Sequence, residues 1–291
     1  MWPSILSLLA CGSPAPAPAP TPQPEPAVST LHQPPAPDTI PEGPFGDAVR
    51  RGQAIVQDTQ THAPQFSGND LSCKNCHIED GRKADAAPLW AAFVSYPAYR
   101  SKNGHVNDFN ERIRGCFTYS MNAQASPAGA APGPDDPVIA DIEAYAYWLA
   151  TGIEVGSDPE GRGFPELARP EHVDIASGES LYQQRCMACH GAEGQGVNGP
   201  DGTVIFPPLW GPQSFNWGAG MHRVNTAAGF IYANMPQGQE GSLTEQESWD
   251  LALYIDSQER PQDPRYAEGE AERDFHDHDC AFHEQGPEQG S

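Results

Sequence analysis

Basic residues are scarce in this sequence. Its 291 residues include 16 Lys and Arg against 39 Asp and Glu, which gives a formal net charge of −23 at pH 7. Proteins that bind nucleic acid need a basic surface for the phosphate backbone, so this charge excludes a general nucleic-acid binder. The same excess of acid argues against attachment to anionic lipid through surface charge.

Long apolar runs are also missing. No segment approaches the roughly 18 apolar residues of a membrane-spanning helix, so we expect no transmembrane span. The first residues, MWPSILSLLACG, hold a short apolar run that ends at Cys11 and resembles a bacterial lipoprotein signal. We therefore expect residues 1–10 to be a lipoprotein-type signal peptide. The exported protein would be anchored on the periplasmic side only through lipid on Cys11; an ordinary signal peptide followed by a chance cysteine is the alternative.

Glycine and proline are abundant, with 29 and 31 residues respectively. Alanine and proline alternate near the N-terminus (SPAPAPAPTPQPEP), a composition that favours extended polyproline II and does not pack a core. We expect residues 11–44 to comprise the lipidated cysteine and this Pro-rich linker. The remaining glycines and prolines predict long loops that need another group to organise them.

From residue 45 onward one plan occurs twice. In each half a helix-like stretch leads to a Cys-rich motif, a long Gly/Pro-rich region follows, and an apolar-periodic helix closes the half. The last helix begins with a capping box, Thr244 and Glu247. The predicted boundaries are a first domain at 45–152, a linker at 153–175, a second domain at 176–262 and an acidic tail at 263–291.

The motif CxxCH also occurs twice, as Cys73, Cys76 and His77 and as Cys186, Cys189 and His190. Two thiols at this spacing reach both vinyl groups of one porphyrin, and the adjacent imidazole coordinates its iron. A zinc site and a thioredoxin-like pair are alternatives, but the spacing between the pairs and the missing βαβ pattern disfavour them. We therefore predict two covalently bound haem c groups. The expected fold is mostly α, with two tandem class I-like cytochrome c domains that each wrap one haem with long loops.

The second haem needs a sixth iron ligand. Met235 follows His190 at a typical distance, in the loop-like stretch YANMPQG, and Met221 is the competitor. A thioether stabilises ferrous iron and raises the potential, so we expect the Met235-ligated haem to be the electron exit.

No Met-Pro pair occurs in the first half. Cys116 and Met121 are the candidates there for the sixth ligand. A thiolate would hold ferric iron strongly and lower the potential. Cys116 could instead be a small buried residue, or pair with Cys280 in a disulfide, which an oxidising compartment favours. The chemistry of the residues leaves these alternatives open.

Several stretches resemble the dihaem c-type thiosulfate dehydrogenases, which couple two thiosulfates into tetrathionate. They are GNDLSCKNCH, YPAYRSKNG, ERIRGCFTYSMN, FPPLWGPQSFNWGAGM and FIYANMPQG, within residues 45–262. In that family the first haem has His and Cys ligands and is the active site, which implies His77 and Cys116 here. The resemblance also implies electron transfer through both haems to a soluble or membrane-associated cytochrome or another high-potential acceptor.

The resemblance further implies a substrate site. Arg112 and Ser120, four residues to either side of Cys116, match family site residues, and a further basic residue falls at Arg100 or Lys102. Some relatives place a lysine just before the methionine ligand, where this chain has Asn234. Residues 74–114 hold seven of the 16 basic residues, a local excess of positive charge that would steer a dianion.

Two other functions remain as alternatives at this point. One is a dihaem electron carrier without catalysis, in which Cys116 is structural. The other is the haem subunit of a multi-protein sulfur-oxidation complex, which also uses a Cys-ligated haem.

Overall fold

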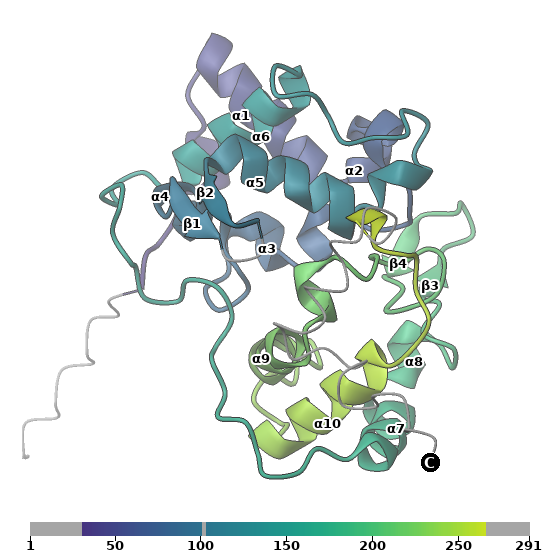
Figure 1. The fold of residues 1–291 in the computed structure, drawn as a ribbon. Coiled ribbons are helices and arrows are strands. Elements are labelled where there is room, and N and C mark those ends of the chain that lie inside the picture. The colour runs from purple at the N-terminus through teal and green to yellow at the C-terminus, as the bar shows by residue number, and fades with distance from the viewer. Residues whose placement is uncertain (1–30, 101–102, 266–291) are drawn as a thin grey trace, which may run out of the picture. The chain divides into compact units, whose positions relative to one another are not determined.

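The structure is a computed structural model that describes residues 31–100 and 103–265 (Figure 1). These residues are mostly helical, with two short β-hairpins, so the prediction of a mostly α fold is confirmed. The signal segment, Cys11, Lys102 and Cys280 lie outside the described residues. None of the helices in the described ranges is long and apolar enough to cross a membrane.

Short helical turns and longer helices alternate along the chain; η marks 3-10 helices, except η4, which is a π-helical turn. The first half comprises η1 (Pro37–Thr39), α1 (Pro44–Gln57), α2 (Thr59–His62), η2 (Pro64–Phe66), η3 (Cys73–Asn75), α3 (Ile78–Gly81), α4 (Leu89–Val94), β1 (Ala98–Arg100), β2 (His105–Asn107), α5 (Phe109–Gly115), η4 (Cys116–Ser120), η5 (Ala123–Ala125) and α6 (Pro137–Leu149). The second half comprises α7 (Ile175–Arg185), α8 (Met187–His190), β3 (Val197–Asn198), β4 (Val204–Phe206), η6 (Gly220–His222), α9 (Val224–Asn234) and α10 (Glu245–Asp256).

Each hairpin is antiparallel and joins neighbouring segments. Strand β1 pairs with β2, so that Arg100 lies opposite His105. Strand β3 pairs with β4 through Val197 and Phe206, with an irregular register. The first hairpin therefore carries Arg100 beside helix α5, which follows directly in the chain.

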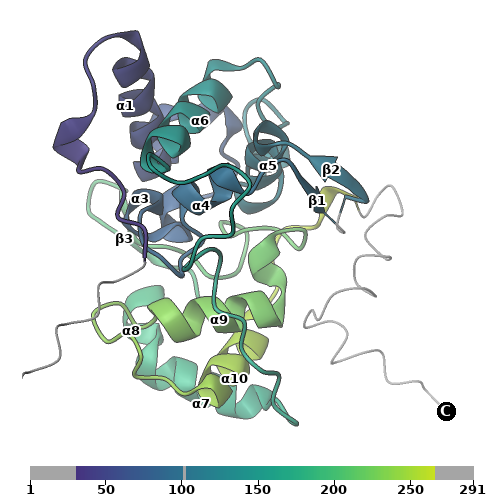
Figure 2. The same ribbon diagram turned by 90° about the vertical axis from the view of Figure 1, so that its left-hand side faces the viewer.

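Two helix pairs cross by the same local device, α1 on α6 and α7 on α10 (Figure 2). A Cβ on Gly52 would lie 2.0 Å from the carbonyl oxygen of Asp141, and one on Gly178 would lie 2.0 Å from that of Asp250. Only a residue without a side chain allows the backbones to approach so closely. Both crossings thus depend on one glycine in the first helix of the pair.

The apolar side chains form two buried clusters. One centres on Val49, Trp90 and Tyr145, which are fully buried, and the other on Tyr182 and Trp249. The first cluster also contains Phe215 and Ala219, which come from the second half of the sequence. The segment between β4 and α9 therefore completes the core of the first half.

The predicted Pro-rich linker differs from expectation in its last part. His32 contacts the Leu149 carbonyl oxygen through Nε2 at 2.8 Å and its ring lies 5.0 Å from the Trp90 ring. Arg82 donates hydrogen bonds to the carbonyls of Pro34 and Pro35. Proline keeps its carbonyl acceptor, and these carbonyls hold the segment on the folded body. The expected start of the tail also differs, since Asp263 is buried.

The expected helix signals are largely present. Thr244 and Glu247 form the predicted capping box at the start of α10. The second CxxCH follows α7 directly, whereas α2 and η2 separate the first CxxCH from α1. After His77 the backbone turns sharply, because Glu79 and Asp80 both have left-handed φ values of 55° and 59°. The first motif therefore does not directly follow a helix, as the second one does.

We expect Gly52→Ala and Gly178→Ala each to lower the free energy of unfolding by about 1–3 kcal/mol, because the added methyl would force the crossing helices apart. Gly133→Ala is the control, since a Cβ there has no neighbour within 4 Å. It should change stability by less than about 0.5 kcal/mol. Denaturant titrations of the haem-loaded variants measure the difference. Equal stability of all three would contradict this account of the crossings.

Candidate functional site

Both CxxCH histidines are held in the same way. His77 Nδ1 lies 2.6 Å from the carbonyl oxygen of Ala87, and His190 Nδ1 lies 2.9 Å from that of Pro207. A carbonyl only accepts hydrogen bonds, so each Nδ1 carries the proton and each Nε2 keeps its lone pair. This arrangement is typical of histidines that bind a metal through Nε2.

The thiols of the first motif are free and half-buried. Burial raises the pKa of Cys73 to about 11, and burial together with the charge on Cys116 raises that of Cys76 to about 12. Thr59 accepts a hydrogen bond from the Cys73 backbone N–H at 3.1 Å, and its hydroxyl lies 3.4 Å from Cys73 Sγ. Two neutral thiols are thus fixed beside an imidazole, as thioether attachment of a porphyrin requires.

Cys116 differs sharply from these thiols. Burial would raise its pKa, but the charge of Arg112 and the neighbouring His77 imidazole outweigh burial and lower the pKa to about 7. Arg112 Nη1 donates to Cys116 Sγ at 3.2 Å, from one turn earlier in α5. Cys116 is therefore a free thiolate-forming residue that faces the His77 imidazole.

The turn that carries Cys116, η4, is held in place by hydrogen bonds that its backbone carbonyls accept from other segments. Asn216 donates from its side chain to the Thr118 carbonyl at 3.1 Å and from its backbone to the Tyr119 carbonyl at 3.1 Å. Asn69 donates to the Ser120 carbonyl at 2.8 Å. Carbonyls at a helix end lack partners within the helix, so these two amides stabilise η4. One of them comes from the second half of the chain.

The predicted substrate residues lie around this turn to different degrees. Arg112 contacts the Cys116 sulfur directly, and the charge of the exposed Arg100 contributes to the lowered pKa of Cys116. Ser120 ends η4, where its carbonyl takes part in the bonding described above. Lys102 lies outside the described residues. The structure thus brings together Cys73, Cys76, His77, Arg112 and Cys116, with Arg100 within electrostatic range.

A cavity of about 610 Å³ lies beside the second motif. Cys186, Cys189 and His190 border it, and so do both candidate methionines, Met235 and Met221. Most of the remaining wall is apolar and includes Phe206, Leu209, Phe215, Phe230 and Ile231. An apolar cavity of this size with two free thiols and an imidazole in its wall is suited to a covalently attached macrocycle.

The two methionines differ in their surroundings. Met235 packs only against the second apolar cluster, whereas Met221 packs against both clusters. Asn234, just before Met235, is fully buried and donates to the Asp85 carbonyl at 2.9 Å. Met235 therefore lies on a segment fixed to the loop that follows the first CxxCH.

Residues of the first CxxCH motif also border the cavity beside the second motif. Lys74, Asn75 and Ile78, from the first motif and its continuation, border that cavity. Lys83 forms an ion pair with Glu240 at 3.6 Å. The two candidate haem sites are therefore neighbours in the described part of the chain, as electron transfer between them requires.

Sequence reasoning missed three residues of these sites. Thr59 positions Cys73, and Tyr96 hydrogen-bonds the Arg112 guanidinium. Asn216 supports the Cys116 turn from far along the chain. None of them belongs to a short motif with the residue that it contacts, so spacing gave no signal for them.

Comparisons with known proteins agree with this geometry. A family model described as cytochrome c matches residues 175–259. The chain is 49% identical over 248 residues to a thiosulfate dehydrogenase of Stutzerimonas stutzeri, covering 85% of this chain and 78% of that protein. It is 45% identical over 282 residues to a thiosulfate dehydrogenase of Thiomonas intermedia, covering 96% and 87% respectively.

A solved structure is also similar. It is the as-isolated form of the thiosulfate dehydrogenase TsdBA from Marichromatium purpuratum, with a TM-score of 0.79 and 52% sequence identity. The match covers 81% of this chain and 51% of that chain, so this chain spans about half the length of that solved protein. Both CxxCH sites fit the group that this family binds, and the chain carries two covalently bound haem c groups. It belongs to the thiosulfate dehydrogenase family of c-type cytochromes.

Proposed function

We propose that this protein oxidises thiosulfate to tetrathionate outside the cytoplasm. Two thiosulfate ions are joined through their sulfane sulfurs, and the two electrons released pass to an external acceptor. The observation that carries this proposal is the contact of Arg112 with the Cys116 sulfur at 3.2 Å, beside the His77 imidazole. A thiolate beside a fixed cation supports a reactive anion site and not merely a relay.

We propose that His77 and Cys116 would hold the iron of the first haem. When bound, it supplies a one-electron acceptor next to the reacting sulfur. The Nδ1–H of His77 is fixed by the Ala87 carbonyl, which aims Nε2 toward Cys116. The Arg112 guanidinium keeps the Cys116 sulfur ionised near neutral pH.

The substrate is proposed to bind through its sulfonate oxygens. Arg112 is held by Tyr96 and by Cys116, and it has further N–H donors for an oxyanion. Arg100 on β1 adds a second positive charge, with Lys102 next to it in sequence. A guanidinium binds planar oxyanion pairs in two-point fashion, so Arg112 would orient the sulfane sulfur. Ser120 is proposed to donate a further hydrogen bond.

We propose that His190 and Met235 would hold the iron of the second haem. We further propose that the fold is two tandem class I-like cytochrome c domains, at 45–152 and 176–262. The equivalent glycine crossings of α1 with α6 and of α7 with α10 support this reading. A thioether ligand raises the potential, which makes the second haem the exit for electrons.

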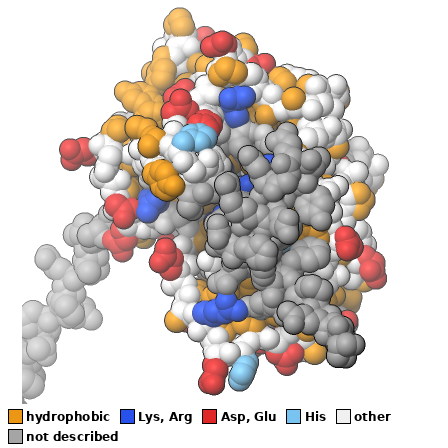
Figure 3. Space-filling view, viewed as in Figure 1, with side chains coloured by type: hydrophobic (Ala, Val, Ile, Leu, Met, Phe, Trp, Pro, Cys, Tyr) orange, Lys and Arg blue, Asp and Glu red, His pale blue; other side chains and the backbone are white. Residues whose placement is uncertain are grey.

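The acceptor and the anchor are also part of the proposal. Figure 3 shows acidic side chains spread over the visible face, with only a few basic ones between them. Together with the net charge of −23, this supports a cytochrome or other high-potential acceptor with a basic docking surface. The lipid on Cys11 would keep the enzyme near such a membrane-associated partner.

We expect Cys116→Gly to abolish thiosulfate-dependent reduction of an artificial acceptor while both haems stay attached. The CxxCH thiols form the thioethers, so haem attachment does not need Cys116. Intact mass spectrometry counts the haems, and electron paramagnetic resonance of the oxidised protein reports loss of the thiolate-ligated signal. A fully loaded variant with most of its turnover would refute the catalytic assignment. No turnover by loaded wild-type protein would favour an electron carrier.

A second variant pair separates binding from general charge. Arg112→Leu should lower kcat/KM for thiosulfate by roughly 10- to 100-fold, the size expected for a lost hydrogen bond to a charged group. Arg114→Leu is the control on the same helix, since Arg114 donates to the Pro132 carbonyl at 3.1 Å. The control should lose less than about threefold, in line with a partly exposed contact. Equal losses in both variants would show that Arg112 acts only through net charge.

The ligand of the second haem is tested by exchanging the methionines. Met235→His should lower the midpoint potential of one haem, because imidazole stabilises ferric iron more than a thioether does. It should also remove the absorption band of the methionine-ligated ferric haem. Met221→Leu should leave both properties unchanged. If Met221→Leu changed the potential and the band while Met235→His left them unchanged, the ligand would be Met221.

A further inference from the structure

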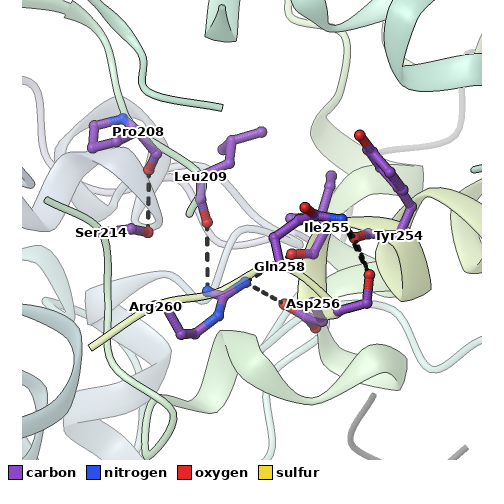
Figure 4. Close-up of polar contacts among 9 residues, drawn as sticks. Pro208, Leu209, Ser214, Tyr254, Ile255, Asp256, Gln258 and Arg260 are labelled. Atoms are coloured by element: carbon purple, nitrogen blue, oxygen red, sulfur yellow. Dashed lines mark hydrogen bonds and ion pairs between the residues drawn. The ribbon is translucent and has the colours of Figure 1, made fainter. Parts of the chain in front are cut away.

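A buried ion pair lies at the end of the last helix. Asp256 closes α10 and Arg260 follows four residues later; both side chains are completely buried. Arg260 Nη2 lies 3.4 Å from Asp256 Oδ1, a long contact for a charge pair. Figure 4 shows the guanidinium between the Leu209 carbonyl and the Asp256 carboxyl group.

Arg260 has enough other partners to remain charged. It donates to the Ile255 carbonyl at 2.8 Å and to the Leu209 carbonyl at 3.4 Å. Its guanidinium carbon lies 4.2 Å from the centre of the Phe215 ring and 5.2 Å from that of Trp217. Carbonyl dipoles and ring faces both stabilise a buried cation. Its Nε atom has no hydrogen-bond partner among the described residues, and burial lowers the pKa of Arg260 to about 10 with the charge of Asp256 acting in the opposite direction, so Arg260 remains charged near neutral pH.

Asp256 is poorly compensated by comparison. Its Oδ2 atom is buried and has no hydrogen-bond partner among the residues that the structure describes. Leaving a buried carboxylate in this condition costs several kcal/mol, so it tends to take up a proton. Burial raises the pKa of Asp256 to about 7, with the charge of Arg260 acting in the opposite direction.

Asp256 also borders the cavity of the second haem, together with Cys186, His190 and Met235. The cavity has further charged residues in its wall, which are Lys74, Glu79, Asp80, Lys83, Arg185 and Glu240. The charged side chain in direct contact with Asp256 is Arg260. A change of charge inside this cavity therefore acts on a carboxyl group that lacks strong partners of its own.

We propose that Asp256 is a redox-linked proton site of the second haem, binding one proton when that haem is reduced and releasing it when the haem is oxidised. The inference rests on the second haem site of the proposed function. The electron comes from the first haem and leaves to the external acceptor, and the proton comes from water and returns to it. Ferric haem carries one more positive charge than ferrous haem, and this charge favours the ionised carboxylate.

The sign of the pH dependence follows from this linkage. The pKa of Asp256 is lower beside ferric haem and higher beside ferrous haem. Between these two values, raising the pH removes a proton that stabilises the reduced state. The midpoint potential of the second haem must then fall as the pH rises, and it must level off on either side of the window.

The test is a redox titration of the methionine-ligated haem in the complete holoenzyme, from about pH 5 to 9. Within the window, the reduced-to-oxidised ratio at a fixed applied potential should fall up to tenfold per pH unit, or about 59 mV for one electron. Asp256→Asn should make the potential independent of pH. Asp250→Asn is the matched control on α10: Asp250 is also buried but accepts from the Asp174 backbone at 2.8 Å. It should keep the wild-type slope.

A second measurement starts from the wild-type holoenzyme, so that the proposal can be tested even if Asp256→Asn binds haem poorly. Reduction of the wild-type holoenzyme should produce the infrared C=O band of a protonated carboxyl group, which shifts with ¹³C-labelled aspartate and is absent in Asp256→Asn. A flat wild-type potential, an unchanged slope in the variant, or a missing carboxyl band would each overturn the proposal. Thiosulfate turnover is measured in parallel at one pH. A flat profile in an enzyme that turns over thiosulfate therefore refutes only this inference.

Discussion

The contact between the Arg112 guanidinium and the Cys116 sulfur is the constraint on which the site depends. A thiol buried among apolar side chains keeps its proton, as the raised pKa values of Cys73 and Cys76 illustrate. Cys116 escapes this outcome because a cation lies one helical turn away and an imidazole faces it. Two sulfurs for covalent attachment and one for ionisation can therefore share one small volume.

The two sites use burial in opposite ways. At the first, a positive charge is directed at a sulfur and creates an anion beside the metal site. At the second, burial lowers the pKa of His190 and raises that of Cys186 to about 11, so both favour their neutral forms beside the apolar part of the cavity wall. The asymmetry suits the proposed division of roles, in which the first site attracts an anion and the second haem, with its raised potential, takes up electrons from the first.

Local patterns in the sequence predicted a large part of this structure. The CxxCH motifs, the capping box at Thr244 and the apolar-periodic helix that closes the first half, α6 in the structure, are all set by contacts within a few residues. Arg112 and Cys116 are four apart on a helix, so their contact also follows from spacing.

Other features depend on contacts between distant segments and left no local signal. Tyr96 reaches Arg112 from outside its helix, and Arg260 is enclosed by the Leu209 carbonyl and the Phe215 ring, which come from much earlier in the chain. The packing of residues 31–43 was not expected either, because a run of prolines shows no hydrophobic face. This segment is held by Arg82, which donates to the backbone carbonyls of Pro34 and Pro35. Every residue type has such a carbonyl, so the sequence of the segment does not reveal the contact.

The amide of Asn216 has one more implication. It belongs to the second half, yet it fixes two carbonyls of the turn on which Cys116 lies. Phe215 and Ala219 enter the first core beside it. A fragment ending near residue 152 would keep the first CxxCH motif but lose the hydrogen bonds from Asn216 that hold the turn carrying Cys116. On the proposed division of roles, the half that would export electrons is thus also a structural part of the half that would oxidise the anion.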